Sequence, residues 1–180
     1  MATSLDWYGC ATFALRTAGL TVFLDAYVDR AEGAAGPGVA ADDVEECDWI
    51  LVGHSHFDHL YGAERIARRT GARIVGSYET VRIMAEAGVP LDQMLCVAGG
   101  ETVALSDDVR VSVYPSQHSC VWSQTKMRDA GEECLGDLGL TLQEQRARFD
   151  GLVAYLAGEL PPPSLDHLLR ARQGDRGDGG

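Results

Sequence analysis

The six residues from His54 to His59, His-Ser-His-Phe-Asp-His, constrain this chain more than any other part of it. They follow an apolar stretch, Trp49 to Val52, that is typical of a buried strand. Imidazole and carboxylate groups suit zinc, manganese or iron, and the run has no thiol to form a closed structural site. A strand that ends in four potential ligands is hard to explain by packing, because polar groups are costly to bury unpaired. The run therefore predicts a metal site at the end of a strand.

The spacing of the four potential ligands indicates how they would divide between ions. His54 and His56 are two residues apart, so in extended backbone their side chains point the same way and can share one ion. Asp58 is two residues further on, and His59 would face away from it, which suits a second ion beside the first. The alternative is a polar loop in which the histidines are coincidental.

The order of expected elements is that of an α/β protein. Turn residues 17–19 separate two strand-like stretches, 5–15 and 20–26, and a loop rich in glycine and alanine covers 29–43. Apolar spacing and glycine stops then predict alternating strands and helices, followed by a run of strands. These are 48–52 (strand), 60–69 (helix), 73–76 (strand), 78–87 (helix), 93–97, 102–105 and 109–114 (strands). This pattern favours helices packed outside a mixed sheet.

The metal-binding run, placed between a strand and a helix, resembles the H-x-H-x-D-H signature of the metallo-β-lactamase superfamily. Residues 7–13 and 21–25 resemble the opening hairpin of its ascorbate-6-phosphate lactonase-like branch, a set of metal-dependent hydrolases. Residues 111–119 resemble the strand that delivers a third histidine, here His118. One departure is Cys10, which stands where many of these relatives carry histidine.

The resemblance implies a set of site residues. His54, His56 and His118 would hold a first metal ion, and Asp58 and His59 would hold a second one incompletely. Asp58 would also be the catalytic residue that orients the nucleophile and accepts its proton. Asp25, which ends an apolar strand, is expected to hydrogen-bond a ligand or the metal loop, although an ordinary turn residue is the alternative. The expected cofactor is zinc, as one or two ions, with manganese or iron as alternatives.

The resemblance also implies a fold, the four-layer αββα sandwich, of which we expect only the N-terminal part plus a C-terminal helical segment. In a single domain over 1–180, residues 1–119 resemble the family core, 120–172 form an insertion-like helical segment and 173–180 a polar tail. The bridging aspartate and final histidine of the family's second half find no match in this sequence. One sheet face would then expose apolar side chains unless a second copy, a missing C-terminal half or the 142–172 helices cover it.

Composition restricts the partners. The net charge of −12 disfavours nucleic acid and acidic membranes, and no apolar run approaches the roughly 18 residues of a membrane span. The five cysteines, an odd number with scattered spacing, are expected to be reduced thiols in a cytoplasmic protein. A small soluble molecule is therefore the expected partner.

These observations lead to two main hypotheses. The first is a metal-dependent hydrolase that uses a metal-activated water on a small soluble ester, lactone or phosphoester. The second is a truncated, weakly metal-binding member with little or no catalytic activity. A nuclease of the same superfamily is disfavoured, because the chain is acidic and has no basic or aromatic cluster.

Overall fold

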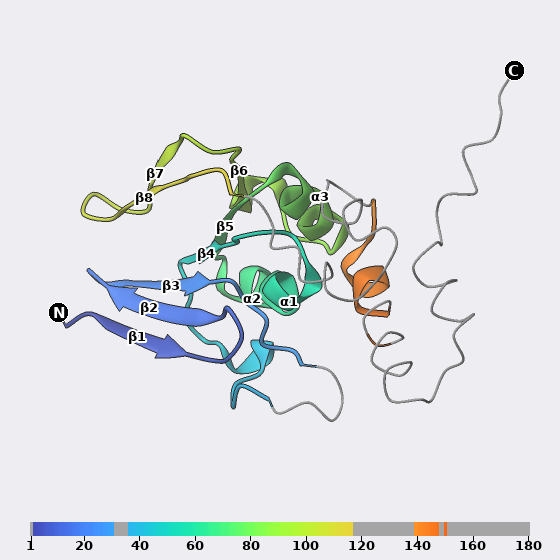
Figure 1. The fold of residues 1–180 in the computed structure, drawn as a ribbon. Coiled ribbons are helices and arrows are strands. Elements are labelled where there is room, and N and C mark those ends of the chain that lie inside the picture. The colour runs from blue at the N-terminus through green and yellow to red at the C-terminus, as the bar shows by residue number, and fades with distance from the viewer. Residues whose placement is uncertain (1, 31–35, 117–138, 148–149, 151–180) are drawn as a thin grey trace, which may run out of the picture.

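The computed structural model describes residues 2–30, 36–116, 139–147 and 150. Within them, six strands form one sheet in the order β1 to β6, and two more strands form a separate hairpin (Figure 1). The strands are β1 (Ser4–Trp7), β2 (Phe13–Thr17), β3 (Leu20–Leu24), β4 (Trp49–Leu51), β5 (Arg73–Gly76), β6 (Met94–Cys96), β7 (Thr102–Ala104) and β8 (Arg110–Ser112). The helices are α1 (Phe57–Leu60), α2 (Ala63–Thr70) and α3 (Tyr78–Glu86), with 3-10 turns η1 (Ala41–Asp43) and η2 (Leu91–Gln93).

The large sheet is mixed, as the sequence predicts. Strands β1, β2 and β3 pair antiparallel, whereas β3, β4, β5 and β6 pair parallel. The connections from β4 to β5 and from β5 to β6 carry the α-helices, which is the α/β arrangement, whereas the described part of the connection from β3 to β4 carries the 3-10 turn η1. This arrangement brings the carboxyl ends of β3, β4 and β5 to one edge of the sheet, where the loops that follow them lie side by side.

The expected long strand over 5–15 is wrong, because the chain reverses direction within it. Gly9 has φ 88° and Cys10 has φ 50°, two consecutive positive values that turn the backbone. The result is two antiparallel strands, with Trp7 opposite Phe13. The apolar alternation continues on both sides of this turn, so hydrophobic pattern alone does not show the break.

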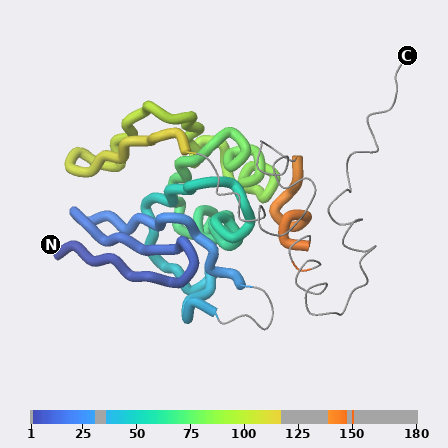
Figure 2. Tube along the Cα trace, in the orientation of Figure 1, coloured from blue at the N-terminus to red at the C-terminus, as the bar shows by residue number. Residues whose placement is uncertain are grey.

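One face of the large sheet is covered by helices. Strand residues Ala14, Phe23, Ile50, Ile74 and Met94 occupy matching positions across β2 to β6 and point to this face. They pack in one buried cluster with residues of α2 and α3. The helices and the sheet therefore share a single core. Figure 2 traces the path of the chain in the orientation of Figure 1.

The helix expected over 60–69 begins at Ala63 as α2, and a separate short helix, α1, precedes it. Gly62 has φ 118° and lies between α1 and α2, so the two helices are distinct. A Cβ at Gly62 would meet Val28 Cγ2 at 2.5 Å, so this crossing needs glycine. The expected end at Gly71 is confirmed, with φ 80° at the helix C-cap.

The opposite face of the sheet is only partly covered. The β7–β8 hairpin packs on the side of β4 to β6, where Trp49 Nε1 donates a hydrogen bond to the Leu105 carbonyl at 3.1 Å. On the β1 side, Leu5 and Trp7 belong to the same face and are 57% and 67% exposed. The apolar face that the sequence predicts is therefore present at the β1 side of the described structure.

Residues 142–147 are helical and lie far along the chain, but they pack near α1 (orange in Figure 1). Leu142 is 1% exposed and joins the core on the helix-covered face. This part of the expected 142–172 helical segment thus covers the helical side and not the exposed sheet face. The remainder of that segment, from residue 151, lies outside the described residues.

Candidate metal centre

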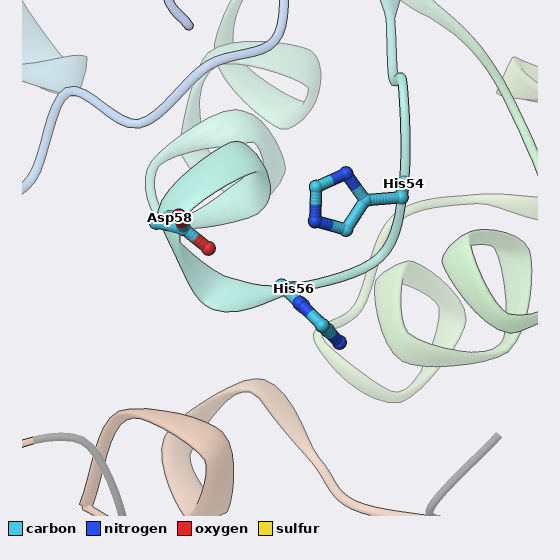
Figure 3. Close-up of side chains that lie close together, drawn as sticks. All are labelled: His54, His56 and Asp58. Atoms are coloured by element: carbon cyan, nitrogen blue, oxygen red, sulfur yellow. The ribbon is translucent and has the colours of Figure 1, made fainter. Parts of the chain in front are cut away.

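The metal loop, residues 53–59, follows β4 and includes the start of α1, at the carboxyl edge of the sheet. His54, His56 and Asp58 each offer one ligand atom, and these three atoms lie within 4.8 Å of one another. Figure 3 shows the His54 ring and the Asp58 carboxylate turned toward each other, with His56 on the loop between them. All three side chains are half-buried, which leaves the cluster accessible. The sequence prediction of a ligand cluster directly after the strand therefore has a geometric basis.

His59 lies against this cluster. Its ring centroid is 3.8 Å from that of His54, and its Nε2 is 3.8 Å from Asp58 Oδ2. The alternation that would turn His59 away from Asp58 does not apply, because Phe57–Leu60 is helical and not extended. Asp58 is thus close to His54 and His56 as well as to His59, and the geometry does not separate two groups of ligands.

Asp25 connects the end of β3 to the metal loop. One carboxylate oxygen, Oδ1, accepts a hydrogen bond from the Gly53 backbone N–H at 2.7 Å, and the other, Oδ2, lies 2.6 Å from His59 Nδ1. The carboxylate is almost fully buried, and its backbone has φ 51°. Asp25 therefore orients the His59 ring with Nε2 toward Asp58, which is the usual way that a carboxylate fixes the tautomer of a ligand histidine.

The surroundings of His59 favour a basic imidazole. Burial lowers its pKa, but the hydrogen bond and charge of Asp25 and the charge of Asp58 outweigh burial and raise the pKa above its ordinary value. A carboxylate on Nδ1 makes Nε2 a better electron donor, which strengthens a bond to a cation. The charges of Asp25 and Asp58 therefore both act on the His59 ring.

Ser55 supports the loop between the two histidines. It is only 5% exposed, and its hydroxyl donates to the Glu79 carboxylate on α3. Its carbonyl accepts a hydrogen bond from Gln145 Nε2 at 3.1 Å. Sequence reasoning missed all three of these residues. The alternation of the loop could have indicated that Ser55 points inward, opposite to His54 and His56, but no sequence signal marks Glu79 or Gln145 as its partners.

The third predicted histidine, His118, lies outside the described residues. The residues that are described fit a transition metal through the chemistry of their donors. Two imidazoles and a carboxylate, converging from one short loop, suit zinc, manganese or iron better than calcium or magnesium, which prefer oxygen ligands alone. A cleft of about 420 Å³ lies elsewhere, beside β6 and β7, and is lined by residues such as Trp49, Arg73 and Glu101, so it does not include the metal loop.

Comparison with known proteins places this loop in a family. A family model described as a beta-lactamase superfamily domain matches residues 21–158. The chain belongs to the beta-lactamase superfamily. The matched region contains the whole metal loop and extends past Ser119 into the segment expected to be insertion-like.

Relatives within the superfamily are named as enzymes. A UPF0173 metal-dependent hydrolase from Pyrobaculum arsenaticum is 36% identical over 115 residues, which cover 64% of this chain and 50% of the relative. A protein of the same name from Anaeromyxobacter sp. (strain K) is 33% identical over 131 residues, covering 69% of this chain and 46% of the relative. The chain thus spans about half the length of the curated relatives it matches.

A solved structure supports the superfamily fold. Igni18, described as a novel metallo hydrolase from Ignicoccus hospitalis, superposes with a TM-score of 0.54 at 20% identity. The match covers 65% of this chain and 50% of Igni18. The mixed sheet with helices on one face is therefore part of a metallo-β-lactamase-like fold, as the sequence resemblance implies. None of the helices in the described ranges is long and apolar enough to cross a membrane.

Proposed function

We propose that this chain carries the metal centre of a hydrolase that acts on a small soluble ester, lactone or phosphoester, with zinc as the expected metal. The observation that carries the proposal is the convergence of His54, His56 and Asp58 within 4.8 Å. The names of the relatives support metal dependence and hydrolysis in general. When bound, a zinc ion would supply a water whose pKa is lowered to about 7 and would polarise the substrate carbonyl or phosphoryl group.

The chain's own residues would perform distinct roles at this centre. His54 and His56, with His118, would hold a first ion, while Asp58 and His59 would contribute to a second. The Asp58 side chain is 45% exposed, so it can contact substrate and accept a proton from the attacking water. Asp25 would hold His59 in the tautomer that leaves Nε2 free for a cation.

A second candidate is a member that binds metal weakly and turns over little or no substrate. The observation behind this alternative is that the clustered candidate ligands among the described residues, His54, His56 and Asp58, all come from one short loop. It also agrees with the absence, in the sequence, of a match to the family's bridging aspartate and final histidine. Without that carboxylate, two cations roughly 3.5 Å apart would repel each other with little compensation.

The partners remain part of this proposal. A small molecule is the expected substrate, and the charge of −12 argues against nucleic acid and acidic membranes. The exposed sheet face around Leu5 and Trp7 would be covered by a second copy or by a segment like the second half of the longer relatives. A cytoplasmic location, expected from the free cysteines, also stays a proposal.

The test combines metal content with turnover. Wild type, Asp58→Asn and the control Asp108→Asn, which changes an exposed aspartate outside the loop, would be dialysed with zinc. Elemental analysis would count ions per chain, and chromogenic esters, lactones and phosphodiesters would measure hydrolysis. We expect about one tight ion, assigned to the three histidines, in wild type, in the control and in Asp58→Asn. The Asp58→Asn variant should lose the weaker second ion and any hydrolysis, because a neutral amide neither offsets a cation's charge nor accepts a proton.

The outcomes separate the two candidates. Turnover in wild type that is lost in Asp58→Asn supports the hydrolase. Bound metal without turnover supports the weakly active alternative. No bound metal in wild type would overturn the metal centre itself.

A further inference from the structure

We propose that Gln145 is a positioning residue for the metal loop. From the helix over 142–147 it holds the backbone of Ser55, the residue between two of the candidate ligands, 90 positions earlier in the chain. Neither the superfamily match nor the names of the relatives assign a role to this residue. The inference rests on the metal centre proposed above, and it adds a support that comes from a distant part of the sequence.

The hydrogen bond acts on one particular peptide group. Gln145 Nε2 donates to the Ser55 carbonyl at 3.1 Å, and this carbonyl belongs to the peptide that leads into His56. His56 is the N-cap of α1, with φ −75° and ψ 153°, and its carbonyl accepts from the His59 N–H at 3.0 Å. A rotation of the Ser55 peptide would therefore change the direction of the His56 ring and the start of α1 together. Gln145 opposes that rotation.

The other side of Ser55 is held independently. Its hydroxyl donates to Glu79 on α3, so the residue is fixed through its side chain by one helix and through its carbonyl by another. With Ser55 nearly fully buried, the loop cannot shift there without breaking a bond inside the protein. Two such contacts define the orientation of the residue, whereas either alone would leave a rotation free.

Gln145 can position the loop because its own helix is anchored. Leu142 is 1% exposed in the main core. Arg146 Nη1 donates to the Asp29 carbonyl at 3.1 Å, and its guanidinium carbon lies 4.9 Å from the centroid of the Tyr61 ring, just after α1. The helix thus contacts the segment after β3 through Asp29 and the residue after α1, Tyr61, and Figure 3 shows it beside His56 and Asp58.

Substitutions at Gln145 separate positioning from folding. Gln145→Glu has nearly the same shape but cannot donate to a carbonyl, and Gln145→Met removes the donor without adding charge. The matched control is Gln143→Glu, on the exposed side of the same helix. Each full-length variant would be measured for zinc affinity by competition with a chromogenic chelator and for geometry by the visible absorption spectrum of the cobalt(II)-loaded protein. Urea unfolding of the metal-free protein would report stability.

We expect Gln145→Glu and Gln145→Met to bind zinc about 10-fold more weakly, the lower end of the range for residues that orient ligands. The cobalt spectrum should change in both, and Gln143→Glu should match wild type. An added negative charge near a cation would by itself strengthen binding, so weaker binding by Gln145→Glu cannot come from charge.

Three results would overturn the proposal, and they differ from one another. Zinc affinity and a cobalt spectrum equal to wild type in both Gln145 variants would refute the positioning role while leaving the metal centre intact. No zinc binding by wild type would remove the centre, and the role with it. If a Gln145 variant unfolds at lower urea than Gln143→Glu but keeps its zinc affinity when folded, Gln145 serves stability alone and the proposal fails.

Discussion

Replacing Asp25 by asparagine tests whether the carboxylate behind His59 prepares the metal centre. The substitution keeps the shape of the side chain, and asparagine tolerates the positive φ of 51° at this position better than most residues. In wild type, Oδ1 of Asp25 accepts a hydrogen bond from the Gly53 N–H at 2.7 Å, and the amide oxygen of asparagine can still accept this bond. The other oxygen becomes an NH2 group facing His59 Nδ1 at 2.6 Å, where two donors would meet.

The expected losses of metal affinity and of stability follow from these two facing donors. His59 can pair with the amide only if its proton moves to Nε2, which is the atom 3.8 Å from Asp58 and the one expected to bind the cation. Loss of such a carboxylate typically weakens metal affinity about 10- to 100-fold. The buried charge-assisted bond itself should be worth about 2 kcal/mol of unfolding free energy in the metal-free protein.

Zinc affinity by chelator competition and urea unfolding would measure the two effects. Asp48→Asn is the control, because Asp48 Oδ2 also accepts a backbone N–H, from Thr21 at 2.7 Å, but lies before β4 at the other end of the strand from the metal loop. Its zinc affinity should equal that of wild type. Equal affinity for the second zinc ion, to which His59 is assigned, in wild type and Asp25→Asn would refute the idea that Asp25 sets the His59 tautomer.

Two further predictions concern the backbone and a buried thiol. Gly62→Ala should cost about 3 kcal/mol of unfolding free energy, because its Cβ would meet Val28 Cγ2 at 2.5 Å. Gly71→Ala, with open space around the new Cβ, should cost about 1 kcal/mol. Equal losses of unfolding free energy, measured by urea unfolding, would contradict the steric argument. Burial raises the pKa of Cys47 to about 12, so a thiol reagent at about pH 8 should label exposed Cys96 but spare Cys47 until the protein unfolds, as peptide mass spectrometry can check. In the unfolded chain the Cys47 thiol ionises near its ordinary pKa of 9.0, so this residue should make folding less favourable as the pH rises from about 9 toward 12; rapid labelling of Cys47 in the folded protein would contradict its burial.

The sequence was sufficient for the features that depend on local pattern. The strand before His54, the glycine stop at Gly71 and the α/β order of elements follow from apolar spacing and glycine chemistry. The ligand cluster was predictable for the same reason, because His54, His56 and Asp58 lie within five consecutive residues and need little tertiary information to meet.

Features that the apolar pattern does not mark were not predicted. The turn at Gly9 and Cys10 interrupts a continuous apolar alternation, so the strand break depends on the backbone and not on the pattern. The helical turn after His56 reversed the expected direction of His59, because a period of two no longer held. Gln145 meets Ser55 across 90 residues, and a glutamine in a helix gives no sign of such a partner.

The contacts that hold the metal loop come from one part of the described structure. The contacts that orient the metal loop come from Asp25, Glu79 and Gln145, all within the described residues and all on the edge or helical side of the sheet. None of them involves the partly covered face around Trp7, where an additional layer would pack. The geometry of the candidate ligands in this loop should therefore not depend on what covers that face. Donors that the described residues do not supply would bear on the occupancy of the proposed second ion and on turnover, and not on the arrangement of these candidate ligands.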